Sequence, residues 1–100
     1  MEHNPFQTSV HPDAIEKLRG YIQFLTRVSE NAGARLYLEY TESIDFLTRH
    51  PESCPLYPPD TRYRYKLFGK RYRIVFEIVG QIVYVDDIQD CREDMDKSLV

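Results

Sequence analysis

Apolar and polar residues alternate with a period of two between Arg62 and Ile88, and this alternation constrains the fold more than any other feature. Such a period places alternate side chains on opposite faces of a β-strand. Gly69 interrupts the first run, and the pair Gly80-Gln81 interrupts the second. Because glycine favours tight turns, we expect three consecutive antiparallel strands.

A two-residue loop at Gly80-Gln81 fixes the expected register of the last two strands. The predicted partners are Ile78 with Val83, Phe76 with Val85, Val75 with Asp86, and Arg73 with Ile88. Along these strands we expect the aromatic and aliphatic side chains to face a core, including Tyr63, Tyr65 and Leu67 on the first strand. The cations are then expected to share the opposite, open face with Tyr84 and Val75. These cations are Arg62, Arg64, Lys66, Arg71 and Arg73.

The charge of the chain is concentrated in this segment. Residues 62–73 hold six bases and no acid, whereas the formal net charge of the whole chain is -3. An edge strand or a solvated face needs only one or two charges of either sign, so six bases favour an anion-binding surface. Arginine suits phosphate, and neighbouring tyrosines can stack on bases, but an acidic protein segment is an equally good ligand by charge.

Two helices are expected before the strands. Ile15, Leu18, Ile22 and Leu25 follow helical spacing after Pro12, and this helix should end near Ser29. The stretch SENAG is expected to be a break. A second stripe then ends near His50, before Pro51, and consists of Leu36, Tyr37, Tyr40, Ile44 and Leu47.

The predicted order is β-α-α-β-β-β, with a first strand at Phe6–Val10 and a stiff, proline-rich connector at Pro51–Pro59. This is an α+β fold in which a two-helix hairpin packs on one face of a mostly antiparallel sheet. The length of 100 residues suits a single domain over 1–100. We expect residues 1–5 and 96–100 to be flexible.

The sequence offers little sign of other chemistry. No apolar run approaches the roughly 20 residues of a membrane helix, and no signal peptide is apparent, so we expect a cytoplasmic protein. Cys54 and Cys91 are expected to be reduced thiols. His3, His11 and His50 are scattered without metal-ligand spacing, and no glycine-rich phosphate loop is present, so no metal or cofactor is expected.

Four segments in this order resemble the RelE/ParE superfamily of type II toxin–antitoxin toxins. They are AIEKLRGYIQFL, ARLYLEYTESIDFLTRHPES, YRYKLFGKRYRIVFEI and VYVDDIQDCRED, and the resemblance covers about residues 8–96. It implies a small cytoplasmic growth inhibitor that a cognate antitoxin neutralises in a hetero-oligomeric complex.

The superfamily divides by target, and the resemblance implies different sites for each. RelE-like members cut messenger RNA on the ribosome, and the matching catalytic residues here are Arg64, Lys66, Arg73 and Arg92. The chain lacks the C-terminal aromatic residue or His-Tyr pair of many cutting members, although Glu77 and Tyr84 lie on the expected cationic face.

ParE-like members inhibit DNA gyrase. Their tail pattern is matched by Asp90, Arg92 and Asp94, and we favour this branch modestly. The partner-binding residues expected on this view are Arg62, Arg64, Lys66, Arg71, Arg73, Tyr84, Asp90, Arg92 and Asp94. An inactive toxin, or a non-toxin protein that binds through its basic face, is the remaining alternative.

Overall fold

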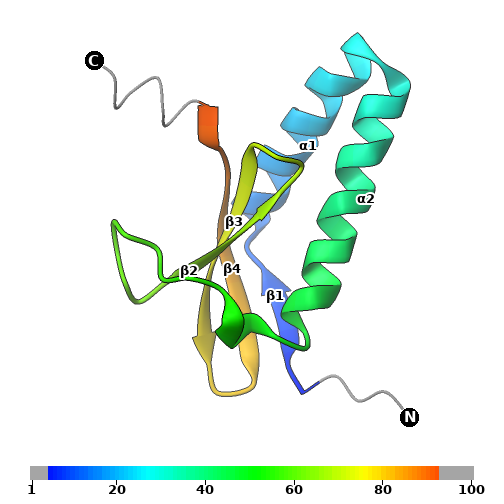
Figure 1. Cartoon of the computed structure of the whole chain (residues 1–100). Coiled ribbons are helices and arrows are strands. Elements are labelled where there is room, and N and C mark those ends of the chain that lie inside the picture. The colour runs from blue at the N-terminus through cyan, green and yellow to red at the C-terminus, as the bar shows by residue number, and fades with distance from the viewer. Residues whose placement is uncertain (1–4, 93–100) are drawn as a thin grey trace.

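The computed structural model describes residues 5–92, and its elements follow the predicted order (Figure 1). The expectation that 1–5 and 96–100 are flexible falls outside these residues, except at Pro5. The elements are β1 (Gln7–Val10), α1 (Pro12–Val28), α2 (Glu30–Leu47), a short 3₁₀ helix (Pro51–Ser53), β2 (Arg64–Phe68), β3 (Tyr72–Val79) and β4 (Ile82–Asp90). The predicted α+β class is therefore confirmed.

The four strands form one sheet in the order β1-β4-β3-β2. β1 is parallel to β4, and the other neighbours are antiparallel. Both helices cover one face of the sheet, while the connector before β2 projects on the other side (Figure 1). Among residues 5–92 no helix is long and apolar enough to cross a membrane.

The break between the helices is shorter than the predicted SENAG, because only Ser29 separates them. Ser29 ends α1 by donating its N–H to the Leu25 carbonyl at 2.8 Å. Its side chain also caps α2 by accepting a hydrogen bond from the Ala32 N–H at 3.4 Å. Serine is a favoured N-cap, so α2 begins directly at Glu30 and includes Gly33.

The core lies between the helices and the sheet. The largest fully buried side chains include Leu47 from α2, Ile74 and Phe76 from β3, and Val83 and Ile88 from β4. Ala14 and Leu18 of α1 belong to the same cluster. Most residues of the helical stripes predicted from sequence belong to this core or pack against it, but Ile15 does not, and Tyr37 is 55% exposed.

A bulge in β4 changes the register that the two-residue loop predicts. The pairs Ile78–Val83 and Phe76–Val85 are confirmed, but Val75 pairs with Asp87 and Arg73 pairs with Gln89. The predicted partners Asp86 and Ile88 are therefore wrong. Val85 and Ile88 are both buried although they are three residues apart, and an extra residue between them allows both to face the core.

The expected orientation of β2 is also wrong. Phe68 is 5% exposed and Leu67 is 53% exposed, so Phe68 is the core residue of the strand. Phe68 lies between Tyr40 and Tyr72, with ring centroids 6.0 and 5.7 Å away. Alternation then turns Arg64 and Lys66 towards the helix side, while Tyr65 and Leu67 turn to the other face.

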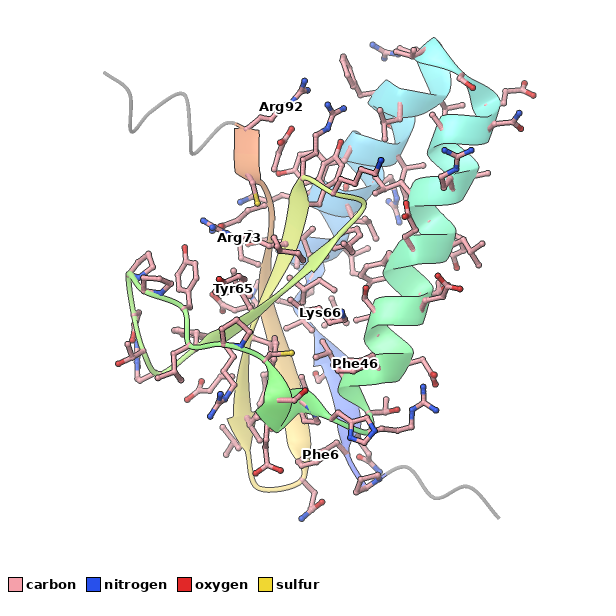
Figure 2. The ribbon with its side chains drawn as sticks, in the orientation of Figure 1. Phe6, Phe46, Tyr65, Lys66, Arg73 and Arg92 are labelled. Carbon is pink, nitrogen blue, oxygen red and sulfur yellow. The ribbon has the colours of Figure 1, made fainter. Side chains whose placement is uncertain are left out.

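The five cations consequently do not share one face. Lys66 pairs with buried Ile74, and Arg64 pairs with buried Phe76, so their side chains leave the sheet on the helix side. Arg73 pairs with Leu67 and lies on the opposite side. Figure 2 shows this division, with Lys66 near Phe46 between sheet and α2, and Arg73 near Tyr65 on the other side.

Candidate functional site

On the helix side, Arg64 and Lys66 are each held by a neighbour. The Arg64 guanidinium donates to the Cys54 carbonyl oxygen at 2.6 Å. The Lys66 ammonium lies 4.6 Å from the centre of the Phe46 ring, a cation–π contact with α2. Burial raises the pKa of the Cys54 thiol, although Lys66 and Arg64 oppose this effect. Cys54 is therefore a buried neutral thiol rather than a reactive thiolate.

On the opposite side, Arg73 is the centre of a patch that we call the loop-side patch, made of Tyr57, Tyr65, Arg73 and Gln89. The Arg73 Nε donates to Gln89 Oε1 at 2.6 Å, and its guanidinium carbon lies 5.2 Å from the Tyr57 ring centre. Gln89 Nε2 donates to the Tyr57 hydroxyl at 3.3 Å. The Tyr57 and Tyr65 rings meet edge to face with centroids 6.5 Å apart. These contacts fix the position of the guanidinium.

Asp87 connects the loop-side patch to α1. One carboxylate oxygen accepts a hydrogen bond from Lys17 Nζ at 2.8 Å, and the other accepts one from Gln89 Nε2 at 3.0 Å. Burial alone raises the pKa of Asp87, but the hydrogen bonds and the Lys17 charge outweigh it and hold that pKa below its usual value. Asp87 is therefore an anion that orients Gln89, and through it Arg73.

The other predicted partner-binding residues are dispersed around the molecule. Arg62 lies in the loop between the connector and β2 and forms an ion pair with Asp60 at 2.8 Å. The Arg71 guanidinium lies 5.8 Å from the Tyr72 ring centre, beside a groove under the helical hairpin. Tyr84 is 41% exposed and pairs with Glu77 on β3. The structure therefore does not bring Arg62, Arg71 and Tyr84 together.

Directly after β4 the chain enters a helical turn at Cys91 and Arg92. The Asp90 carboxylate accepts a hydrogen bond from the Arg92 N–H at 3.0 Å. The Cys91 N–H donates to the Arg71 carbonyl oxygen at 2.7 Å, which ties this turn to the start of β3. Arg92 is exposed and stands at the top of the sheet (Figure 2). Asp94, the last residue of the predicted tail pattern, lies outside the described residues.

The arrangement of cations limits the chemistry that the site can perform. Electrostatic stabilisation of a reacting phosphate requires several donors that converge on one position. Arg64 and Lys66 lie on one side of the sheet, and Arg73 lies on the other, so these three do not converge. Between residues 5 and 92 no group of three or more histidine, cysteine or acidic side chains is placed to hold a metal ion.

Sequence reasoning missed four members of this region: Tyr57, Gln89 and Asp87, which it did not assign to the site, and Tyr65, which it expected to face the core. Tyr57 belongs to a proline-rich connector whose path is not encoded by any periodic pattern. Gln89 joins Arg73 only because the bulge shifts the register by one residue. The adjacent acids Asp86 and Asp87 interrupt the apolar alternation of a central strand. This interruption was the signal in the sequence that β4 contains a bulge there.

The helical hairpin and the four-stranded sheet define a small α+β domain with the element order that the sequence resemblance implies. A family model described as the ParE toxin of the type II toxin–antitoxin system, parDE, matches residues 9–95. The chain therefore belongs to this family of type II toxins. The search of curated proteins found no match.

Proposed function

We propose that this chain inhibits DNA gyrase by binding to it, and that a cognate antitoxin neutralises the chain in the cytoplasm. Membership of the ParE toxin family supports the first statement, and the type II system to which that family belongs supports the second. The proposal needs a rigid protein-binding surface rather than a catalytic centre.

The observation that favours gyrase over RNA as the target is the placement of the cations on two opposite sides of the sheet. Cleavage of RNA by electrostatic means would bring Arg64, Lys66 and Arg73 around one phosphate. Lys66 instead contacts Phe46 of α2, and Arg64 donates to the Cys54 carbonyl oxygen on the same side of the sheet. A surface that binds a protein has no such requirement, because separate contacts can contribute from different places. The RNA-cutting alternative is therefore less well supported.

The surface that we assign to gyrase is the loop-side patch together with the turn at Asp90 and Arg92. Tyrosine and arginine are the residues most enriched among those that dominate protein–protein binding energy. Arg73 is held in place by Gln89 and Tyr57 before any partner arrives. Holding a side chain in advance reduces the entropy lost on binding, so Arg73 is expected to contribute more than Arg92.

Expression of the chain without its antitoxin in a bacterial host tests the proposal. We expect growth arrest with a DNA damage response, while the rate of protein synthesis stays normal at first. Arg73→Gln should weaken inhibition at least tenfold, since the loss of such an anchor costs about 2 kcal/mol. Arg27→Gln, which removes an equal charge at the exposed end of α1, is the matched control and should remain fully toxic.

Two results would contradict the proposal. An immediate stop in protein synthesis with cleaved messenger RNA would identify the RNA-cutting alternative. Normal growth at a high level of folded protein would identify an inactive toxin or a binder of another kind.

A further inference from the structure

Gln89 lies between two side chains that together allow its amide group only one orientation. Its Oε1 accepts a hydrogen bond from Arg73 Nε at 2.6 Å, and its Nε2 donates to Asp87 Oδ2 at 3.0 Å. The Nε of arginine can only donate, and an ionised carboxylate can only accept. The oxygen of Gln89 must therefore face Arg73, and its nitrogen must face Asp87.

Two donors hold the other oxygen of Asp87 and fix the direction of the carboxylate. Lys17 Nζ and the Ile88 N–H donate to Oδ1 at 2.8 and 2.9 Å. Asp87 and Gln89 are two residues apart on β4, so their side chains leave the same face of the strand. Only 26% of the Asp87 side chain is exposed, and hydrogen bonds that are shielded from water are stronger.

We propose that Asp87 and Gln89 are positioning residues for the binding of gyrase, because they hold the Arg73 guanidinium in its binding orientation. The inference rests on the proposed function and adds to it two side chains that act through Arg73 and need not contact gyrase. The essential feature is the direction of the hydrogen bonds, from Arg73 to Gln89 and from Gln89 to Asp87. The negative charge of Asp87 matters less, provided that this direction is kept.

The substitution Asp87→Asn reverses the direction of these hydrogen bonds although it hardly changes the shape of the side chain. The remaining side-chain oxygen stays with its two donors, Lys17 and the Ile88 N–H, so the new amide nitrogen faces Gln89. Two amide nitrogens cannot hydrogen-bond to each other, and the Gln89 amide turns over to present its oxygen there. Its nitrogen then faces Arg73 Nε, which is also a donor, so Arg73 loses its acceptor.

A second substitution, Gln89→Glu, should reverse the effect of the first. A glutamate carboxylate accepts on both sides, so it receives hydrogen bonds from the new amide and from Arg73 Nε at the same time. The Tyr57 hydroxyl, which accepts from Gln89 Nε2 at 3.3 Å in the wild type, becomes a donor. The double variant Asp87→Asn/Gln89→Glu therefore restores the position of Arg73 without restoring the charge next to Lys17.

The affinity of each variant for immobilised gyrase tests the proposal. We expect Asp87→Asn to bind about fivefold more weakly, the effect of one lost hydrogen bond, and the double variant to bind within about twofold of wild type. Lys17→Gln leaves Asp87 as an acceptor and should weaken binding by less than about threefold, because a half-exposed ion pair contributes little. Asp13→Asn, which removes the same charge from a side chain that is 89% exposed, is the matched control and should bind like wild type.

Nuclear magnetic resonance of the free chain tests the orientation of Arg73 without gyrase. The Arg73 Nε–H proton should exchange slowly with water in the wild type and in the double variant, because an acceptor faces it in both. In Asp87→Asn it should exchange about tenfold faster, since a hydrogen bond protects a proton from exchange. Gln89→Met removes the acceptor directly, so it should show the same loss of affinity and of protection, and it keeps the test valid if Asp87→Asn does not fold.

The two measurements separate this inference from the proposed function. Full gyrase affinity of Asp87→Asn, or a double variant as weak as Asp87→Asn, would overturn the inference and leave gyrase binding intact. Lys17→Gln as weak as Asp87→Asn would assign the effect to the ion pair instead. A wild-type chain that does not bind gyrase would overturn the proposed function and the binding role of Asp87 and Gln89 with it, while the exchange rates would still show whether they hold Arg73.

Discussion

Gly33 lies at a close approach between the two helices, where there is no room for a Cβ atom. A Cβ placed on Gly33 would lie 2.0 Å from the Thr26 hydroxyl oxygen, which itself donates to the Ile22 carbonyl oxygen at 2.7 Å. Glycine in a helix lowers stability relative to alanine, so its presence here is explained by the close approach of α1. Gly20, in α1, has open space around the same position.

Alanine at these two glycines should therefore have opposite effects. Gly33→Ala should lower the free energy of unfolding by about 1–3 kcal/mol, because the new methyl group forces the helices apart. Gly20→Ala should raise it by about 0.5–1 kcal/mol through its better helix propensity. Urea unfolding followed by circular dichroism measures both. Equal stability of the two variants would show that the helices do not approach as closely as described.

Asp87 makes stability depend on pH in a defined direction. Its pKa is lower in the folded protein than the value of about 3.9 that is usual for an unfolded chain. The carboxylate therefore contributes stability above pH 4, and this contribution is lost as the pH falls through the folded-state pKa.

A double-mutant cycle of Lys17→Gln and Asp87→Asn isolates this contribution. Since Lys17 is half-exposed, we expect a coupling energy of only about 0.5–1 kcal/mol at pH 6, and a smaller one at pH 2, because protonation of Asp87 removes the ion pair. Urea unfolding of the four proteins at both pH values provides the measurement. A coupling that grows on acidification would mean that Asp87 is not stabilised as the anion.

Among the elements, β2 is the strand for which the alternation of residues does not predict which face points to the core. Aromatic residues occur in both frames of this strand, Tyr63 and Tyr65 in one and Phe68 in the other, so the period alone predicts either orientation. The ring contacts of Phe68 with Tyr40 and Tyr72 favour its burial, and the connector covers the tyrosines on the far side. The helices lack this ambiguity, and the residues of their predicted stripes are buried or partly buried, except for Tyr37, which is 55% exposed.

The orientation of β2 can be tested with two truncations on adjacent residues. Phe68→Ala should lower the free energy of unfolding by about 3–5 kcal/mol, as expected for a buried aromatic residue. Leu67→Ala should cost less than about 1 kcal/mol, because the leucine is half-exposed. Chemical denaturation measures both changes. If Leu67→Ala were the more destabilising variant, Leu67 would face the core, and the cations of β2 would share one face with Arg73.

For the whole molecule, the sequence predicts the element order and most of the core, because both follow from local periodicity. It does not predict the site, which depends on three non-local features. These are the frame of β2, the extra residue in β4, and the path of the connector that brings Tyr57 over Arg73. Each depends on packing between segments far apart in the chain, which no periodic pattern reports.

The most direct test of the central claim is a supercoiling assay with purified gyrase, relaxed plasmid and ATP. We predict that the purified chain abolishes supercoiling or traps cleaved plasmid at near-stoichiometric amounts, and that prior mixing with its antitoxin restores activity. Unaffected gyrase at a large excess of the folded chain, together with codon-dependent cleavage of messenger RNA in a translation extract, would contradict the account.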